Sequence, residues 1–384
     1  MSKAWAGLML KALRQAVRGH GATGPNPLVG ALVARDGRVV ATGYHARVGE
    51  AHAEVMALDR AGAGALGADL VVTLEPCSHY GRTPPCVDRI VASGVRRVVV
   101  GCLDPNPREQ GRGAELLRRA GLEVIIGVEG ERCRRLNEAY FKYILTGIPF
   151  VVVKLAISLD GRIATRTGDA RWISGPEAGR FVHGLRRDCN AVMVGGGTVR
   201  LDDPALTVRL VRPDTRPLRV VVSSGRDLPC EARVFHDQDR WPTVLFATAA
   251  TPAPARQALE ARGVRVEVVQ GDEGRVDLAE ALRRLGRAGV SRLLVEGGGE
   301  LAGQLLAGGL IDRLLVIQAP VIIGSTGLPS VGGALPDVLS ALPRYRFEWT
   351  RRLGADCLAS VRMGPDYCST QEGLGTCPPR RATL

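Results

Sequence analysis

Three residues in the first quarter of the sequence have the types and spacing of metal ligands. His52 stands two positions before Glu54, Cys77 follows a proline at the end of an apolar run, and Cys86 comes nine positions later. One imidazole and two thiolates form a soft ligand set that suits zinc and leaves the fourth tetrahedral position open for water. Bound zinc lowers the pKa of water to about 7, and Glu54 could carry the proton from water to a leaving amine. The pattern predicts hydrolytic removal of an amino group.

Each of these residues also has a simpler interpretation when it is taken singly. His52 could cap a helix or lie in the core, Glu54 could be a solvated charge, and the two cysteines could be small buried residues. Positions i and i+2 of a regular helix do not face each other, so His52 must lie at an irregular first turn. Eight residues separate Cys77 from Cys86, whereas the general zinc-deaminase signature has Cys-x-x-Cys.

Two glycine-rich segments of the second half could hold a dinucleotide. Gly195 to Gly197 precede Thr198, and Gly297 to Gly299 precede Glu300. Glycines let backbone amides approach a pyrophosphate at the start of a helix. Neither segment has the Gly-x-Gly-x-x-Gly pattern followed about twenty residues later by an acidic residue, so a standard Rossmann site is not indicated, and plain turn glycines are the alternative.

Charged residues of the second half could bind an anionic substrate. Arg186 and Arg209 could hold a phosphate bidentately, or they could be solvated surface groups. Lys154 follows three valines and must be partly buried, where its alternative role is a structural ion pair with Glu296 or Asp160.

The order of apolar runs predicts two α/β domains. An amphipathic first helix and a hairpin turn at Asp36-Gly37 open residues 1–147, a three-layer α/β domain. A second alternation of strands and helices fills residues 148–364. Residues 365–384 lose this periodicity and gain Pro, Gly, Ser and Thr, which predicts a disordered tail. The predicted strands lie in the apolar runs 28–35, 39–44, 69–75, 96–102, 122–128, 150–164, 190–200, 218–224, 242–248, 264–270, 291–306 and 313–324.

Composition argues against several classes of protein. The net charge of +12 is spread evenly and aromatic residues make up 4% of the chain, so nucleic-acid binding is not expected. No apolar run is long enough to span a membrane and no signal peptide is evident, so a cytoplasmic enzyme without a membrane partner is expected. Nine cysteines, an odd number, fit reduced thiols better than a disulfide framework. Those outside the ligand set are interpreted as packing residues (Cys102, Cys133, Cys189, Cys230, Cys357) or exposed tail thiols (Cys368, Cys377).

Longer strings of the sequence resemble the bifunctional riboflavin-pathway deaminase/reductase family. The most specific is TLEPCSHYGRTPPC, at residues 73–86. The resemblance covers residues 1 to about 363 and excludes only the tail. The other matching strings are Pro25-Asn26-Pro27, Gly43-Tyr44-His45, His52-Ala53-Glu54, KLAISLDGRIA, WIS, GGGTVRLDDPALTVR and VEGGGELAGQLL.

The resemblance implies a cytidine-deaminase-like domain followed by a dihydrofolate-reductase-like domain, in a homo-oligomer. The implied substrate is 2,5-diamino-6-(5-phosphoribosylamino)pyrimidinone, which loses its 2-amino group before NADPH reduces the ribosyl carbon. His52, Cys77 and Cys86 match the zinc ligands, with one Zn²⁺ per chain, and Glu54 matches the general acid and base.

The resemblance also assigns ligand contacts position by position. Arg82 stands where some relatives have lysine, and the Asp104 and Asn106 assignments compete with simple turn chemistry. Asp202 and Lys154 are candidates for the proton donor of the reduction. The substrate contacts are Asn26, His45, His79, Arg82, Asp104, Asn106, Lys154, Ala170, Arg186, Leu206, Arg209 and Glu296. The cofactor contacts are Ala156, Trp172, Thr198, Asp202, Ser224, Gly298, Gly299, Glu300, Leu301, Ala302, Gly303 and Gln304.

Two other functions remain open at this point. A zinc deaminase acting on a base in RNA could use the positive charge to hold phosphates. A second domain without reductase chemistry could sense a nucleotide or mediate assembly.

Overall fold

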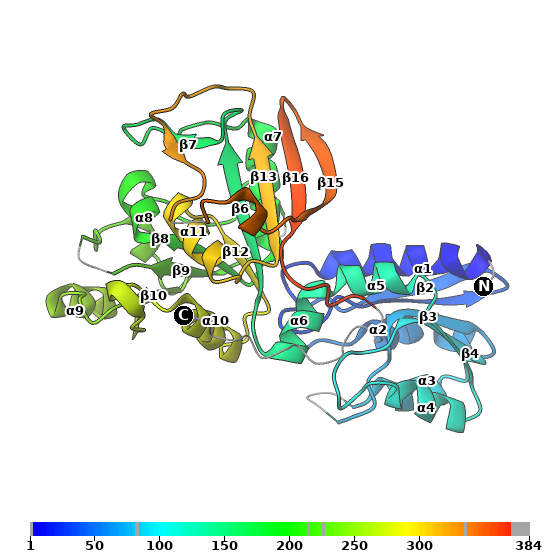
Figure 1. Cartoon of the computed structure of the whole chain (residues 1–384). Helices are drawn as coiled ribbons and strands as arrows, with labels where there is room; N and C mark the ends of the chain where they lie inside the picture. The colour runs from blue at the N-terminus through cyan, green and yellow to red at the C-terminus, as the bar shows by residue number, and fades with distance from the viewer. Residues whose placement is uncertain (1–2, 81–83, 213–214, 225–226, 334–335, 370–384) are drawn as a thin grey trace. The chain divides into compact units, whose positions relative to one another are not determined.

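A computed structural model describes residues 3–80, 84–212, 215–224, 227–333 and 336–369. The chain divides into two compact units, which are described separately (Figure 1). Unit 1 comprises residues 1–19, 26–145 and 365–384, and unit 2 comprises residues 20–25 and 146–364.

Unit 1 is a five-stranded sheet between two layers of helices, as the sequence predicts. The strand order is β2-β1-β3-β4-β5, in which β1 is antiparallel to both of its neighbours and β3, β4 and β5 run parallel. The strands are β1 (Gly30–Arg35), β2 (Arg38–Tyr44), β3 (Asp69–Leu74), β4 (Arg97–Cys102) and β5 (Glu123–Ile126). The helices are α1 (Lys3–Ala16), α2 (Ala53–Ala61), α3 (Cys86–Ala92), α4 (Arg112–Arg119), α5 (Gly130–Leu136) and α6 (Glu138–Thr146).

Period-two alternation of apolar side chains places hydrophobic residues on both faces of this sheet. Ala31 and Val33 of β1 pack toward α2 and α3, whereas Leu32 and Ala34 pack toward α1. Figure 1 shows α1 and α5 on one face of the sheet and α2, α3 and α4 on the other. The β1–β2 turn has positive φ at Asp36 and Gly37 (50° and 76°), which confirms the predicted hairpin turn.

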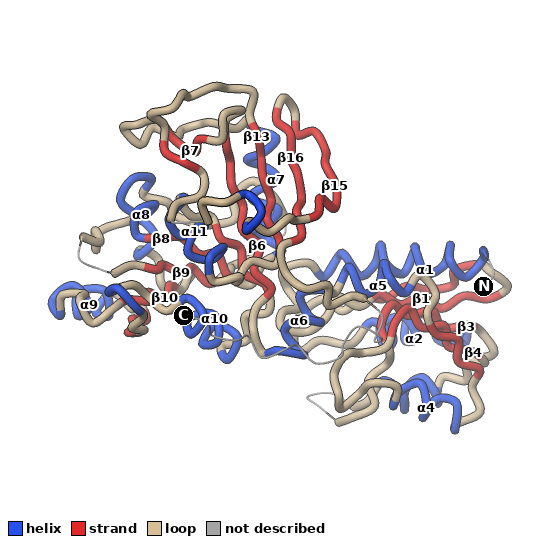
Figure 2. Tube along the Cα trace, viewed as in Figure 1, coloured by secondary structure: helices blue, strands red, loops and turns tan. Residues whose placement is uncertain are grey.

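Unit 2 is built on a nine-stranded sheet, with a separate pair formed by β7 (Arg162–Ala164) and β14 (Leu328–Pro329) (Figure 2). The large sheet has the order β11-β10-β9-β8-β12-β6-β13-β16-β15, parallel from β11 to β13 and antiparallel beyond it. Its strands are β6 (Phe150–Ile157), β8 (Ala191–Gly195), β9 (Leu218–Val222), β10 (Thr243–Ala247), β11 (Arg265–Val268), β12 (Arg292–Val295), β13 (Arg313–Gln318), β15 (Arg346–Leu353) and β16 (Asp356–Arg362). Its helices are α7 (Pro176–Asp188), α8 (Gly196–Asp202), α9 (Ala253–Ala261), α10 (Leu278–Arg287) and α11 (Gly299–Ala307).

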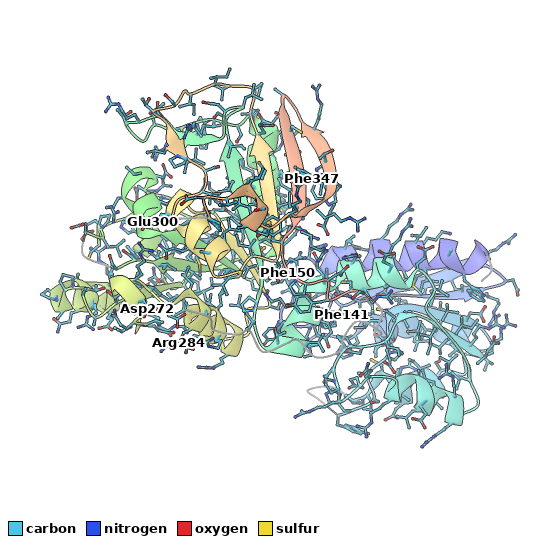
Figure 3. All side chains as sticks on the ribbon, in the orientation of Figure 1. Phe141, Phe150, Asp272, Arg284, Glu300 and Phe347 are labelled. Carbon is cyan, nitrogen blue, oxygen red and sulfur yellow. The ribbon has the colours of Figure 1, made fainter. Side chains whose placement is uncertain are left out.

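The antiparallel end of the second sheet differs from the sequence prediction. The apolar run 313–324 is a strand only as far as Gln318, because Pro320 has no N–H to donate to a ladder. The β15–β16 hairpin was not predicted, since β15 is arginine-rich and largely exposed. Phe347 of β15 is 67% exposed at the edge of the sheet (Figure 3).

The first residues after unit 2 return to unit 1, which corrects the prediction that the tail begins at Pro365. Asp366 forms two hydrogen bonds with Arg135, of 2.9 and 2.7 Å, and Cys368 is buried. Cys357, in contrast, is exposed, so the predicted environments of Cys357 and Cys368 are both wrong. Residues 370–384 of the predicted tail, with Cys377, lie outside the described residues. Among the described residues, no helix has the length and apolarity needed to cross a membrane.

Candidate metal centre and a second cavity

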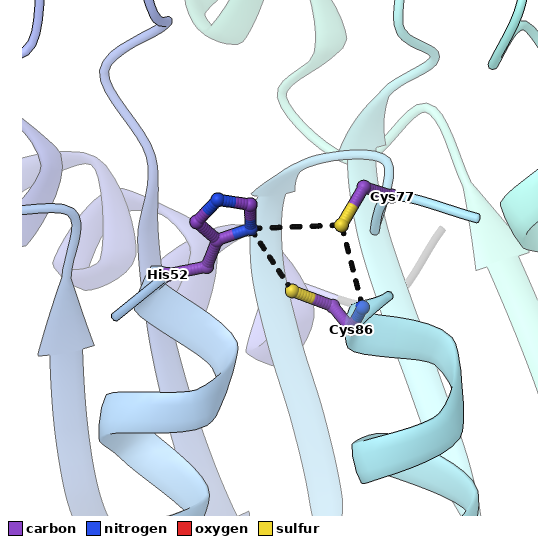
Figure 4. Close-up of side chains that lie close together, drawn as sticks. All are labelled: His52, Cys77 and Cys86. Carbon is purple, nitrogen blue, oxygen red and sulfur yellow. Dashed lines mark hydrogen bonds between the residues drawn. The ribbon is translucent and has the colours of Figure 1, made fainter. Parts of the chain in front are cut away.

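Three elements of unit 1 bring His52, Cys77 and Cys86 together (Figure 4). His52 is the residue before α2 and has an extended backbone (φ −69°, ψ 160°). Its side chain therefore leaves the chain before the helix begins, which resolves the i, i+2 geometry with Glu54. Cys77 follows the carboxyl end of β3, and Cys86 is the first residue of α3.

The three side chains form a compact donor set. His52 Nδ1 lies 3.2 Å from Cys86 Sγ and 3.5 Å from Cys77 Sγ, and the backbone N–H of Cys86 donates to Cys77 Sγ over 3.3 Å. A tetrahedral zinc ion with bonds of about 2.0 to 2.3 Å spaces its ligands roughly 3.5 Å apart. The donor chemistry and the spacing therefore both fit zinc.

The surroundings of the donor set favour the thiolate form of Cys77 and raise the pKa of the Glu54 carboxyl group. The hydrogen bond from Cys86 lowers the pKa of the Cys77 thiol to about 4, while the same contact raises the pKa of Cys86. A bound dication would displace the proton that these two thiols share. Burial, with the neighbouring Cys77 thiolate, raises the pKa of Glu54 to about 7.

Asn26 and His45 lie beside the donor set. Asn26 Nδ2 is 3.3 Å from His45 Nε2, and His45 Nδ1 is 3.3 Å from the carbonyl oxygen of Ala51. Burial lowers the pKa of His45, and its ring packs edge-on against His52 at 5.4 Å between centroids. Two of the predicted substrate contacts are thus assembled with the predicted ligands.

Asp104 and Asn106 form the turn after β4. The backbone N–H of Asn106 donates to Asp104 Oδ1 over 2.8 Å, and Tyr140 Oη donates to the same oxygen over 3.0 Å. Burial raises the pKa of Asp104 to about 6. The turn chemistry is present, whereas a substrate contact by either residue stays a prediction.

Sequence reasoning missed two buried acidic residues in this region. Glu75 accepts three backbone N–H groups, from Asp104 (3.2 Å), Gly111 (2.9 Å) and Ala114 (3.0 Å), and so fixes the segment after β4. Glu109 is paired with His79 Nδ1. Glu75 could have been predicted from the sequence, because it stands two positions before the ligand Cys77 in the string LEPC. The predicted contact Arg82 lies outside the described residues.

Unit 2 contains a cavity of about 1010 Å³ at the carboxyl ends of its central parallel strands, where open α/β sheets bind ligands. Most of the residues predicted to bind substrate or cofactor in this unit line it. They are Lys154, Ala156, Ala170, Trp172, Arg186, Thr198, Asp202, Leu206, Arg209, Ser224, Glu296, Gly298, Gly299, Glu300, Leu301 and Gln304.

Two predicted cofactor residues, Ala302 and Gly303, do not line the cavity and are buried in α11. A Cβ on Gly303 would lie 1.7 Å from the carbonyl oxygen of Gly332, so this glycine permits close packing of α11 on that segment. Glu300 occupies the first turn of the same helix (Figure 3).

Arg186 is engaged by protein groups in the cavity wall. Its guanidinium forms a two-pronged ion pair with Glu296, at 2.5 and 3.0 Å, and donates to the carbonyl oxygen of Thr207 over 3.0 Å. Burial lowers the pKa of Lys154, while Glu296 opposes that shift. The alternative role of Lys154, an ion pair with Glu296 or Asp160, is not found within 4.0 Å among the described residues, and Lys154 is one of the residues that line the cavity. Arg209 is exposed, and its guanidinium donates a hydrogen bond to Thr207 Oγ1, whereas that of Arg186 is paired with a carboxylate.

Comparisons with known protein families assign each unit. The family described as the cytidine and deoxycytidylate deaminase zinc-binding region matches residues 3–102. The family described as the RibD C-terminal domain matches residues 149–359.

Whole-chain relatives cover both units. The riboflavin biosynthesis protein RibD of Escherichia coli (strain K12) is 40% identical over 369 residues, which is 92% of this chain and 98% of the relative. The RibD of Aquifex aeolicus is 43% identical over 316 residues, covering 82% of this chain and 87% of the relative.

Solved structures agree with this assignment. Acinetobacter baumannii RibD has a TM-score of 0.85 at 33% identity, over 94% of this chain and 99% of that chain. The Thermotoga maritima diaminohydroxyphosphoribosylaminopyrimidine deaminase/5-amino-6-(5-phosphoribosylamino)uracil reductase has a TM-score of 0.83 at 35% identity, with the same coverage. The metal centre of unit 1, the cavity of unit 2 and these whole-length likenesses together place the chain in the RibD family of bifunctional riboflavin biosynthesis enzymes, with a zinc-binding deaminase unit and a reductase unit.

Proposed function

We propose that unit 1 converts 2,5-diamino-6-(5-phosphoribosylamino)pyrimidin-4-one to 5-amino-6-(5-phosphoribosylamino)uracil. The observation that carries this proposal is the set of His52, Cys77 and Cys86 beside the buried Glu54. Zinc, when bound, supplies the Lewis acidity that makes water a nucleophile at neutral pH. Glu54 takes a proton from the attacking water and gives it to the 2-amino group, which leaves as ammonia. Asn26 and His45 hold the pyrimidine edge.

We further propose that unit 2 reduces the ribosyl chain to give 5-amino-6-(5-phosphoribitylamino)uracil. The reductase family implies a nicotinamide cofactor, which supplies the hydride when bound. Within the cavity, Lys154 and Asp202 are the candidate proton donors, and Arg209 is the candidate contact for the substrate phosphate. Arg186 holds the carboxylate of Glu296 in place through its two-pronged ion pair.

We propose NADPH as the form of the cofactor. Six arginine residues line the cavity, and a planar guanidinium suits the additional 2′-phosphate of NADPH. The test is the ratio of kcat/KM for NADPH and NADH, which we expect to favour NADPH. A ratio near one would contradict this choice without affecting the reductase assignment. The lining arginines besides Arg186 are Arg171, Arg200, Arg209, Arg233 and Arg275.

The deaminase proposal is tested by measuring zinc content and ammonia release together. Wild type should hold about one zinc per chain, and Glu54→Ala should keep the metal while kcat falls about 10² to 10⁴-fold. Cys86→Ser removes one ligand and should lower the zinc content itself. Unchanged turnover in Glu54→Ala would refute the proposed proton carrier. The expected homo-oligomer and cytoplasmic location stay predictions, and light scattering of the purified protein tests the first.

A further inference from the structure

The carbonyl group of Ser224, a residue of the cavity wall in unit 2, is held by two buried threonines. Thr248 Oγ1 donates to the Ser224 carbonyl oxygen over 3.2 Å, and Thr251 Oγ1 donates to the same oxygen over 2.9 Å. Thr248 is fully buried and Thr251 is 3% exposed, so neither hydroxyl has bulk water as an alternative partner. The two hydrogen bonds use both lone pairs of the carbonyl oxygen. The backbone at Ser224 is therefore held in one orientation.

The two threonines stand on an anchored turn after β10. The backbone N–H of Thr251 donates to the carbonyl oxygen of Thr248 over 3.1 Å, and the N–H of Ala250 donates to Thr248 Oγ1 over 3.3 Å. The residue before Ser224 is also fixed, because the N–H of Ser223 donates to the carbonyl oxygen of Phe246 over 3.1 Å. The contact between the threonines and Ser224 thus has a rigid support on both sides, as a positioning contact requires.

Two other polar groups of Ser224 can serve a ligand in the cavity. Ser224 follows the end of β9, is exposed and lines the cavity. Within the described part of the chain, neither its backbone N–H nor its Oγ has a hydrogen-bond partner. Both groups can donate hydrogen bonds, so they suit a ligand group that is rich in acceptors, such as a phosphate.

Arg200 of α8 lies beside the same end of the cavity. A Cβ built on Gly196 would lie 2.5 Å from Ser223 Oγ and 3.7 Å from Arg200 Nη1, so the serine and the guanidinium are close neighbours. Arg200 is exposed and lines the cavity, and no described carboxylate lies within 4.0 Å of its guanidinium. Arg186, in contrast, is paired with Glu296. Arg200 therefore has a full positive charge to offer an anionic ligand.

The order of the strands distinguishes this end of the cavity from the end that holds Lys154. The carboxyl ends of β6, β12, β8 and β9 follow one another across the sheet. Lys154 is on β6, and the two glycine segments that could hold a pyrophosphate follow β12 and β8. Three strand spacings, about 14 Å, separate β6 from β9, which is comparable with the length of an extended dinucleotide. If the nicotinamide lies near Lys154, Ser224 and Arg200 are placed to meet the adenosine ribose.

We propose that Arg200 and Ser224 bind the 2′-phosphate of NADPH, and that Thr248 and Thr251 are positioning residues that hold Ser224 for this contact. The inference deepens the proposed choice of NADPH in unit 2 and rests on it. Arg200 supplies a charge-assisted hydrogen bond, and Ser224 supplies hydrogen bonds from its N–H and Oγ. NADH has an uncharged hydroxyl group in place of this phosphate and gains little from the guanidinium. These residues therefore select the cofactor and take no part in the reduction itself.

The test measures the Kd of NADP⁺ and of NAD⁺ on the full chain by titration calorimetry, which does not depend on turnover. Arg200→Gln should raise the Kd of NADP⁺ about 10- to 100-fold, because a charge-assisted hydrogen bond is lost. The Kd of NAD⁺ should not change. In steady-state reduction, the same variant should show a higher KM for NADPH at an unchanged kcat. Arg287→Gln removes an exposed arginine of α10 that is paired with Glu280 outside the cavity, and it should bind both cofactors as wild type does.

Two substitutions of Thr251 test the positioning role. Valine is similar in shape but lacks the hydroxyl, so Thr251→Val should raise the Kd of NADP⁺ about three- to tenfold and leave that of NAD⁺ unchanged. Thr251→Ser retains the hydroxyl and should keep the wild-type ratio of the two constants. A packing defect alone would weaken the binding of both cofactors. Because Arg200 is exposed, Arg200→Gln keeps the inference testable if Thr251→Val does not fold.

The outcomes separate the parts of the inference. An unaltered ratio of the two Kd values in Arg200→Gln overturns the phosphate contact. Equal weakening of both cofactors in Thr251→Val, or the same loss in Thr251→Ser, overturns the positioning role. If wild type itself binds NADP⁺ and NAD⁺ alike, the proposed choice of NADPH fails instead, so the two failures are distinguishable.

Discussion

His183 of α7 is buried, and its hydrogen bond in the folded protein requires the neutral form of the imidazole ring. Its Nδ1 accepts the backbone N–H of Arg209 over 2.9 Å, which a protonated Nδ1 could not do. Burial, together with the positive charges of Arg186 and Arg209, lowers its pKa from 6.5 to about 4. Between these two pH values the unfolded chain binds a proton that the folded chain does not. Unit 2 should therefore lose stability as the pH falls through that window.

The measurement is urea unfolding of unit 2 at a series of pH values. His183→Asn keeps an acceptor near the Arg209 N–H without a titrating ring, so its stability should fall less than that of wild type as the pH decreases below 6.5. His236→Asn, at an exposed histidine, serves as the matched control. Identical pH profiles for wild type and His183→Asn would contradict this linkage.

The candidate metal ligands were easier to predict from the sequence than the residues that form supporting contacts around the two sites. His52, Cys77 and Cys86 are recognisable because zinc restricts ligand types, and the structure brings them together. Glu109 and the Arg186–Glu296 pair depend on contacts across 30 and 110 residues, which no local pattern encodes. Arg186 was thus predicted as a phosphate ligand, although the fold gives it a carboxylate partner.

At the scale of elements, α11 depends on a glycine for its packing. A Cβ at Gly303 would overlap the carbonyl oxygen of Gly332, a residue of the cavity wall, whereas a Cβ at Gly184 in α7 would meet nothing within 4 Å. Gly303→Ala should therefore destabilise unit 2 by about 1 to 3 kcal/mol and weaken binding of the nicotinamide cofactor. Gly184→Ala should be neutral or stabilise by up to about 1 kcal/mol.

Thermal unfolding and cofactor titration of the two alanine variants check this expectation. If both variants behave alike, the close approach of α11 to Gly332 does not limit packing in solution. A weaker cofactor complex only in Gly303→Ala would support the inferred role of α11 in shaping the cavity.

Strands could be predicted from apolar runs in the sequence wherever both faces of the strand are buried. Apolar runs such as Val151–Val153 became central parallel strands because both faces are covered. The β15–β16 hairpin was not predicted because an exposed edge strand such as β15 needs no apolar pattern. The pairing of β16 with β13 is a tertiary contact, which no local sequence pattern encodes.

At the scale of the whole molecule, each unit contains its own set of candidate reactive residues. The predicted zinc ligands lie in unit 1, and all residues that line the large cavity lie in unit 2. Removal of zinc by a chelator should therefore abolish ammonia release and leave reduction of supplied 5-amino-6-(5-phosphoribosylamino)uracil unchanged. Oxidation of the reduced nicotinamide, followed by absorbance, measures the second activity. Readdition of zinc should restore the first, and a parallel loss of both activities would show that the units are not independent.

The return of Asp366 and Cys368 to unit 1 bears on the order in which the protein can mature. Arg135 and Asp366 are 231 residues apart, and Arg134 and the carbonyl group of Cys368 are 234 apart. During synthesis, residues 26–145 leave the ribosome before residues 146–364 have been made. The deaminase unit must therefore wait for translation of the entire reductase segment before it can form its last native contacts. Premature termination within unit 2 would release a deaminase unit whose Arg134 and Arg135 lack these partners.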